Sequence, residues 1–339
     1  MAWGRRKPAA LKPEEIARAW RRTVRAAVDK DWASAETWLE RIVESDSADL
    51  DAYHALARLY RQQGAVGRAI RMHQNLLLRT NLPKQDRSEA LYELARDFED
   101  GGYSERAAAT YEEFLDLDPR NAEAITRVIP LLGEQREYDR ALALAKKLRR
   151  RDAEAAQRLE TELLLTRSRS CLDEGDHDGA RQALKRCLRR DKDCASALSM
   201  LGELETERGK SAKALGAWKR AALADAQIAR ELYAKIDAGF AAKGKPAEYD
   251  AFLREILSQR PDDAFARIAL ARALAGRGEG HAAIEEIARA IEIDPDDMSL
   301  RAELGRQLLA TNQDSEALKA YSDLIEAIER RPVAEETLV

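Results

Sequence analysis

Residues 50–77 read LDAYHALARLYRQQGAVGRAIRMHQNLL, and this stretch decides the fold. In its second half, Ala69, Ile70 and His73 follow the i, i+1, i+4 spacing that places side chains on one face of an α-helix. Gly64 precedes that segment, and glycine readily adopts the positive φ angle of a tight turn. The stretch therefore predicts two helices that are joined at Gly64.

This hairpin pattern recurs along the chain, and most of its copies start 34 residues apart. The copies begin near Ile16, Leu50, Ser88, Ala122, Thr161, Ala195, Arg230, Ala264 and Met298. Thirty-four residues is the period of the tetratricopeptide repeat, whose unit is a helix, a turn and a second helix. The sequence predicts an all-α fold, a right-handed superhelical solenoid of about nine tetratricopeptide-repeat hairpins.

Fixed positions within the hairpins support this alignment. The twentieth position needs a small side chain because the two helices cross closely there, and only Tyr249 interrupts a series of alanines. Six glycines stand at the predicted turns: Gly64, Gly102, Gly175, Gly209, Gly244 and Gly278. Position twenty-four is apolar or aromatic in most hairpins and is His73 in the second one. We therefore predict that His73 is a packed core residue that donates one hydrogen bond.

The sequence predicts three segments and indicates where in the cell the protein is found. Residues 1–15 are a basic N-terminal lead-in, residues 16–331 form the solenoid, and residues 332–339 are a free C-terminal tail. The junctions at 78–89 and 149–160 are longer than the others, so we expect longer connections there and a sub-boundary near 149–160. The net charge of −4 gives no field that favours nucleic acid. No apolar stretch is long enough to span a membrane, which favours a cytoplasmic protein.

The sequence contains few features that indicate an enzyme or a metal-binding protein. Phosphate-binding loops, nucleophile elbows and zinc-protease motifs are absent from the sequence, so we expect no enzyme and no cofactor. Cys171, Cys187, Cys194 and His177 lie near the fifth hairpin and leave open a metal protein or enzyme centred there. Their spacing contains no C-x₂-C pair, so we expect buried free thiols and no bound metal.

The concave wall of such a solenoid is the expected binding surface. Positions two, five, nine and twelve of the first helices line it, and arginine and tyrosine are enriched at the energetic centres of interfaces. The candidate protein-binding residues are His54, Arg58, Arg61, Tyr92, Arg96, Arg169, Arg272 and Arg306. Phe265 and Ile268 add an apolar area. We expect charge reversal at Arg58, Arg61 and Arg96 to weaken partner capture without lowering thermal stability.

The N-terminal segment is locally basic. It contains only two acidic residues, Glu14 and Glu15. Its basic residues are Arg5, Arg6, Lys7, Lys12, Arg18, Arg21, Arg22 and Arg25. Such a segment either touches an anionic membrane surface peripherally or is a solubilising lead-in to the first helix.

Residues 59–115 resemble the bacterial lipopolysaccharide assembly protein B family. The resemblance rests on GAVGRAIRMHQNLL (64–77), on QDR at 85–87 within the longer junction, and on the ELARDF and GGYSERA segments that follow. It implies an adaptor at the cytoplasmic face of the inner membrane that links lipid A synthesis to lipopolysaccharide export. The implied protein partners are the membrane protease FtsH and the deacetylase LpxC.

The chain departs from that family at both ends. The family begins with a membrane-anchoring helix and ends in a rubredoxin-like metal ribbon with two C-x₂-C pairs. Here the sequence begins MAWGRRKPAALKPEE and has no cysteine after Cys194, so we expect neither the anchor nor the bound metal. The main hypothesis is a protein-binding scaffold in lipopolysaccharide or envelope regulation. The alternative is a general tetratricopeptide scaffold for an unrelated complex.

Overall fold

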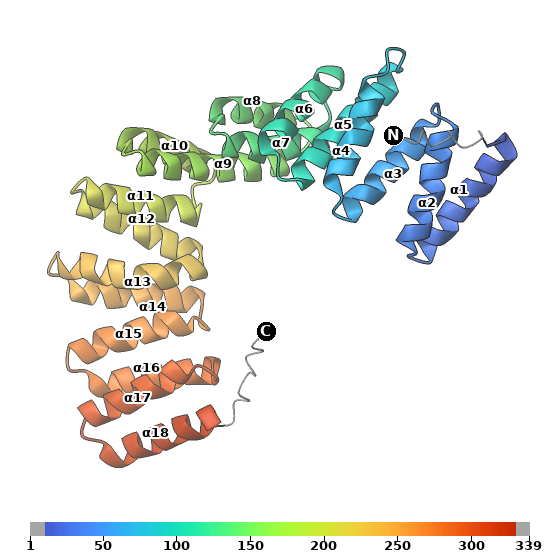
Figure 1. Ribbon diagram of the computed structural model, residues 1–339. Coiled ribbons are helices and arrows are strands. Elements are labelled where there is room, and N and C mark those ends of the chain that lie inside the picture. Colours follow the sequence, from blue (N-terminus) through green and yellow to red (C-terminus); the bar gives the residue numbers. More distant parts are fainter. Residues whose placement is uncertain (1–10, 330–339) are drawn as a thin grey trace, which may run out of the picture. The chain divides into compact units, whose positions relative to one another are not determined.

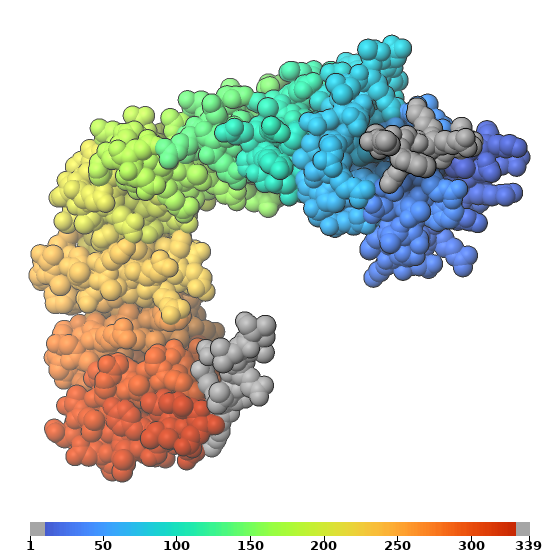
Figure 2. All heavy atoms as spheres, viewed as in Figure 1, coloured from blue at the N-terminus to red at the C-terminus, as the bar shows by residue number. Residues whose placement is uncertain are grey.

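The computed structural model describes residues 11–329, which form 18 α-helices and no strand (Figure 1). Consecutive helices pair as hairpins, each with a first and a second helix, so the predicted all-α helical-repeat solenoid is confirmed. Side chains fill the spaces between neighbouring helices of each compact unit (Figure 2). None of the helices within residues 11–329 combines the length and the apolar character that crossing a bilayer requires.

The chain divides into two compact units, which we call the N-terminal unit (Met1–Arg167) and the C-terminal unit (Ser168–Val339). The boundary falls within helix α9 (Ala153–Asp173). The N-terminal unit contains α1 (Pro13–Val28), α2 (Trp32–Ser45), α3 (Leu50–Gln62), α4 (Val66–Leu77), α5 (Lys84–Asp100), α6 (Ser104–Leu117), α7 (Ala122–Glu134) and α8 (Tyr138–Leu148). The C-terminal unit contains α10 (His177–Arg190), α11 (Ala195–Glu207), α12 (Ser211–Ala224), α13 (Ala226–Ala241), α14 (Pro246–Gln259), α15 (Ala264–Gly276), α16 (Gly280–Ile293), α17 (Met298–Ala310) and α18 (Asp314–Glu329).

The turn inside each hairpin has the same backbone geometry. All six glycines predicted at these turns have φ angles between +65° and +83°, which confirms their role. The other three hairpins reach the same left-handed conformation with Lys30, Arg136 and Asn312, at φ angles of 57°, 61° and 57°. A residue with a Cβ pays about 1 kcal/mol for that conformation. Asn312 tolerates this conformation better than Lys30 and Arg136 do, so only at Lys30 and Arg136 does the turn form against the local preference of the sequence.

The small residues at position twenty lie where the two helices of a hairpin meet. All eight alanines are at most 2% exposed: Ala35, Ala69, Ala107, Ala141, Ala180, Ala214, Ala283 and Ala317. Tyr249, which replaces alanine in the seventh hairpin, is also buried, and its hydroxyl donates a hydrogen bond to the Tyr233 carbonyl at 3.0 Å. The alignment of the repeats thus correctly predicts which residues are buried at position twenty of the hairpins.

The sequence predicts longer connections at 78–89 and 149–160, but the structure shows that the added residues do not form loops alone. Helix α5 begins at Lys84 and helix α9 at Ala153, so part of each insertion extends a first helix at its N-terminal end. The added residues include alanine, glutamine, glutamate and arginine, all good helix formers, and Asp152 caps α9 by accepting the Ala155 amide hydrogen at 2.8 Å.

Helix α1 begins at Pro13, inside the expected lead-in, and residues 1–10 and 330–339 lie outside the described residues. The tail expected at 332–339 and the cations Arg5, Arg6 and Lys7 therefore lie outside the described part of the chain. Helix α7 continues through Pro130 to Glu134.

Candidate protein-binding site

The predicted wall residues all lie on first helices of the hairpins. His54, Arg58 and Arg61 lie on α3, and Tyr92 and Arg96 lie on the neighbouring first helix α5. The other three are separated along the C-terminal unit: Arg169 on α9, Arg272 on α15 and Arg306 on α17. The structure therefore brings the first five residues together and leaves the last three apart.

Arg61 lies in a buried ion-pair network. Only 8% of its side chain is exposed, and its guanidinium lies 2.8 Å from Glu93 and 2.8 Å from Asp97 on α5. Arg58 adds a second guanidinium at 2.8 Å from Glu93. Burial alone would raise the pKa of Glu93, but hydrogen bonds from Arg61 and the charges of both arginines outweigh burial and lower that pKa. Arg61 therefore joins two first helices, and we no longer expect its charge reversal to leave stability unchanged.

Two histidines extend this network into the core. His73 Nδ1 lies 2.6 Å from Asp97 Oδ2, and His73 Nε2 lies 3.2 Å from Nδ1 of His54. Because an ionised carboxylate only accepts hydrogen bonds, Nδ1 of His73 carries the hydrogen. His73 is fully buried, which confirms the prediction of a packed histidine that donates a hydrogen bond. His54 is only 5% exposed, so it does not offer a partner the surface that the sequence suggested.

We expect the N-terminal unit to lose stability between pH 6.5 and pH 4. Burial, followed by electrostatic repulsion from His73 and Arg58, lowers the pKa of His54 from its ordinary value of 6.5 to about 4. As the pH falls below 6.5 the unfolded chain binds a proton at His54 and the folded chain does not, so stability is complete above pH 6.5 and falls towards pH 4. The expected loss is about 2–3 kcal/mol. Urea unfolding followed by circular dichroism across this pH range measures it.

The variant His54→Gln keeps a hydrogen-bonding side chain without a titrating group, so its stability should vary less with pH over the same range. His281→Gln, which changes an exposed histidine on α16, is the matched control and should behave as the parent does. Equal pH dependence of His54→Gln and the parent protein would contradict the assignment.

The remaining predicted residues of the N-terminal unit form a surface of mixed charge. Arg58 also pairs with Glu89 at 3.3 Å, and Arg96 lies 3.9 Å from Glu93. Tyr92 lines a cavity of about 590 Å³ together with Phe114, and their ring centroids are 5.2 Å apart. Neighbouring carboxylates thus balance most of the arginine charge that the sequence placed here.

In the C-terminal unit, Arg169 and Arg306 are exposed. Arg306 forms an ion pair with Glu303 on the same helix, which reduces the charge it can offer to a partner. Arg169 has no ion pair within residues 11–329 and does not line the cavities formed by Tyr92 or by Arg272.

A groove of the C-terminal unit, with a volume of about 370 Å³, spans the successive first helices α13, α15 and α17. Phe265, Ile268 and Arg272 of α15 line it, together with Arg230 of α13 and the start of α17 at Ser299. The guanidinium of Arg230 lies 4.1 Å from the centre of the Phe265 ring, a cation–π distance. The sequence identified Phe265, Ile268 and Arg272 as wall residues, but it gave no sign of Arg230.

The charges in this cavity suit an acidic and apolar ligand. Within residues 11–329, neither Arg230 nor Arg272 is paired with a carboxylate, so both guanidinium groups are available to an incoming acid. The wall also contains two carboxylates: Asp297, which accepts hydrogen bonds from Ser299, and Asp237, whose pKa is raised by burial and by the charge of Asp250. Tyr249 and Tyr233 add aromatic surface. An extended peptide with a carboxylate next to an apolar side chain has complementary groups for this wall.

The three cysteines do not gather into a ligand set. Cys187 is buried on α10, and Cys171 and Cys194 are partly buried. His177 lies 3.3 Å from Glu207. In the described part of the chain, no three histidine, cysteine or acidic side chains are arranged to hold a metal ion. A hydrogen bond from Cys187 is the main cause that lowers the pKa of Cys194, to about 6.

Comparison with known families identifies the repeat. The family model described as "Tetratricopeptide repeat" matches residues 165–229, which include the end of α9, all of α10, α11 and α12, and the start of α13. Together with the hairpins and the conserved turn geometry of the whole described chain, this match supports a tetratricopeptide-repeat protein.

Curated relatives carry one name. The chain is 27% identical over 259 residues to lipopolysaccharide assembly protein B of Escherichia coli strain K12, a match that covers 75% of this chain and 65% of that protein. It is 34% identical over 111 residues to the protein of the same name from Haemophilus influenzae, covering 32% of this chain and 28% of that protein. The chain therefore resembles lipopolysaccharide assembly protein B and spans about 65% of the length of the Escherichia coli relative.

Solved structures of tetratricopeptide-repeat proteins are also similar. A tetratricopeptide repeat protein from Parabacteroides merdae is 13% identical, covers 87% of this chain and 99% of its own, and superposes with a TM-score of 0.42.

Proposed function

We propose that this tetratricopeptide-repeat protein is a non-enzymatic scaffold that binds other proteins through the groove of its first helices. The observation that supports this most directly is the cavity of the C-terminal unit, where Phe265 and Ile268 lie beside Arg230 and Arg272, which have no carboxylate partner in the described part of the chain. Buried apolar anchors next to arginine are typical of the centre of a protein interface.

We further propose that the scaffold acts in lipopolysaccharide assembly, in the cytoplasm and peripherally at the inner membrane. The similarity to lipopolysaccharide assembly protein B supports this setting. The partners to test first are FtsH and LpxC, which the resemblance of residues 59–115 suggests. The alternative is a tetratricopeptide scaffold with the same groove and an unrelated partner.

The test measures binding of the purified chain to purified FtsH and LpxC by surface plasmon resonance. We expect at least one of them to bind, and the double variant Arg230→Glu/Arg272→Glu to weaken that binding at least tenfold. Lys213→Glu/Arg254→Glu is the control with the same change in charge, since Lys213 on α12 and Arg254 on α14 are exposed and lie outside the cavity. Its affinity should stay within twofold of the parent.

Two results would change the proposal. Absence of binding to both proteins would reject the lipopolysaccharide setting and leave the general scaffold. Binding that is unaffected by the double variant would reject the groove of the C-terminal unit as the binding site.

A further inference from the structure

A second cavity, in the N-terminal unit, is lined by cations. It has a volume of about 700 Å³ and lies between the α6–α7 connection, the C-terminal half of α8 and the α8–α9 connection, which contains Arg150 and Arg151. Five basic residues contribute to its wall: Arg120, Lys146, Lys147, Arg150 and Arg151. The remaining lining residues, Pro119, Ile125 and Ala143, are apolar. No acidic residue lines it, in contrast to the groove of the C-terminal unit.

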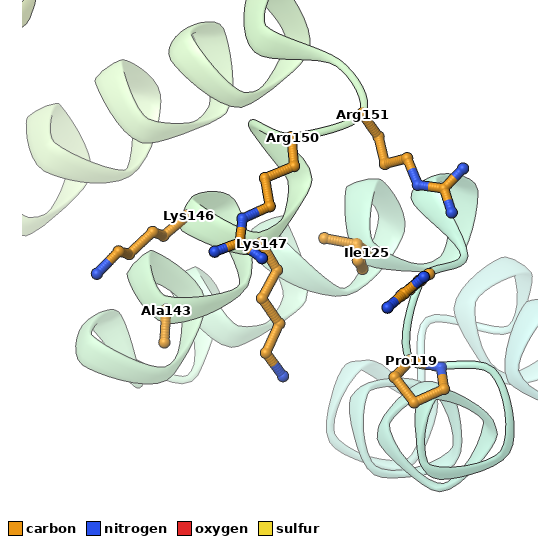
Figure 3. A pocket seen from close by; sticks show the side chains of 8 residues that line it. Pro119, Ile125, Ala143, Lys146, Lys147, Arg150 and Arg151 are labelled. Atoms are coloured by element: carbon orange, nitrogen blue, oxygen red, sulfur yellow. The ribbon is translucent and has the colours of Figure 1, made fainter.

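The side chains surround a shared space. In Figure 3, Lys147 and Arg150 lie on one side of Ile125 and Arg151 lies on the other, with Pro119 nearby. Lys146 points away from Ile125 in the same view. Cations on opposite sides of an apolar floor can contact one ligand from several directions, which a flat basic surface does not allow.

These cations have no partner among the described residues. Within residues 11–329 no carboxylate forms an ion pair with any of the five, although most other arginines of this unit are paired. The acidic residues nearest in sequence bind backbone and amide hydrogens instead: Asp118 accepts hydrogen bonds from the Asn121 side chain and the Arg120 backbone, and Asp152 caps α9. Neighbouring Arg149 is neutralised by Glu160. Unpaired like charges repel one another, so an anion that enters the cavity is stabilised by the cations that face it, which in Figure 3 do not include Lys146.

We propose that this cavity binds a compound that carries two or more phosphate groups. Its volume is within the range of small-molecule sites, which is about 300–1,000 Å³. The basic residues that line this cavity favour a ligand of high negative charge density. A phosphate group carries more negative charge than a carboxylate does. The guanidinium groups of Arg150 and Arg151 can each contact two phosphate oxygens, and Lys147 adds a point charge. The site does not depend on the proposed function of the C-terminal groove.

The experiment is isothermal titration calorimetry of the full chain with sodium tripolyphosphate at low salt. We expect saturable binding with one site per chain. The variant Lys147→Gln/Arg150→Gln/Arg151→Gln should weaken it at least tenfold. The control variant Lys192→Gln/Lys213→Gln/Arg254→Gln removes the same charge from exposed, unpaired positions of the C-terminal unit and should stay within twofold. Circular dichroism verifies that both variants are folded.

A pair of single variants tests the geometry of the cavity. Arg150→Gln should weaken tripolyphosphate binding at least threefold, whereas Lys146→Gln should change it less than twofold because Lys146 points away from Ile125. Unsaturable binding, or equal losses in the cavity variant and the control variant, would overturn the proposal. Tighter binding of hexaglutamate than of tripolyphosphate would also overturn it and indicate an acidic peptide site.

Binding to lipid vesicles distinguishes two sources of the phosphate groups, a lipid headgroup and a free phosphorylated compound. If phosphatidic acid vesicles bind the parent chain and not the cavity variant, while phosphatidylcholine vesicles bind neither, the phosphate groups belong to a lipid headgroup. If tripolyphosphate binds and no vesicle does, the ligand is a free phosphorylated compound. Both results support the proposal that the cavity binds phosphate groups.

Discussion

Replacing Arg61 with alanine is expected to lower the free energy of unfolding of the N-terminal unit by about 3–5 kcal/mol. The variant leaves Glu93 and Asp97 with side chains only 4% and 0% exposed and without the guanidinium that lies 2.8 Å from each. Removing one partner of a buried ion pair costs more than the pair contributes, because the remaining charge stays out of water. Urea unfolding of the full chain, followed by circular dichroism, measures the loss.

The matched control is Arg96→Ala. Arg96 lies 3.9 Å from the same Glu93 carboxylate, but about a third of its side chain is exposed, so its loss should cost less than about 1 kcal/mol. Hydrogen exchange should place the effect of Arg61→Ala in α3 and α5, which the ion pairs join. Equal stability of the two variants would show that Arg61 does not hold these helices together.

This expectation changes how binding data for Arg61 should be interpreted. A variant that loosens α3 and α5 also displaces Tyr92 and Arg96, so weaker partner capture would not by itself identify Arg61 as a contact. Arg58 is the better probe of this surface, since about half of its side chain is exposed. Binding measurements on Arg61 variants are informative only beside their unfolding free energies.

Much of the fold was predictable because its determinants are local. A turn that needs a positive φ angle favours glycine, and a close helix crossing needs alanine, so each hairpin repeats the same signals. The hairpin turns at Lys30 and Arg136 carried no such signal, whereas Asn312 is a residue type that tolerates the left-handed conformation and could have been identified. The helical extensions at Lys84 and Ala153 were missed because a repeat alignment treats every insertion as a loop.

The candidate sites were less predictable because they depend on pairs that are distant in sequence. Arg61 meets Asp97 across 36 residues, and the position of Arg61 in its helix is the same whether or not a carboxylate faces it. The polar chain from His54 through His73 to Asp97 joins three helices for the same reason. The run of basic residues from Lys146 to Arg151 is visible in the sequence, but the cavity it forms with Arg120 appears only in the structure.

The second large effect is expected at Gly202. A Cβ atom at this position of α11 would lie 2.2 Å from Nε1 of Trp218 on α12, far inside van der Waals contact. Trp218 is 8% exposed and packed in the core of the C-terminal unit, so its ring has little room to move. Gly202→Ala should therefore destabilise this unit by about 2 kcal/mol, although alanine favours a helix by about 1 kcal/mol.

Two further variants isolate the cause of that loss. Gly216→Ala on α12 meets no atom within 4 Å of the added Cβ, so it should be neutral or stabilise the chain by up to about 1 kcal/mol. Trp218→Leu shortens the opposing side chain and removes no hydrogen bond, because the indole nitrogen has no partner in the described structure. If steric overlap is the cause, Gly202→Ala should cost at least about 1 kcal/mol less in the Trp218→Leu background than in the parent chain. An identical cost in both backgrounds would show that the residues at these two positions do not compete for space, and that glycine at position 202 serves another purpose.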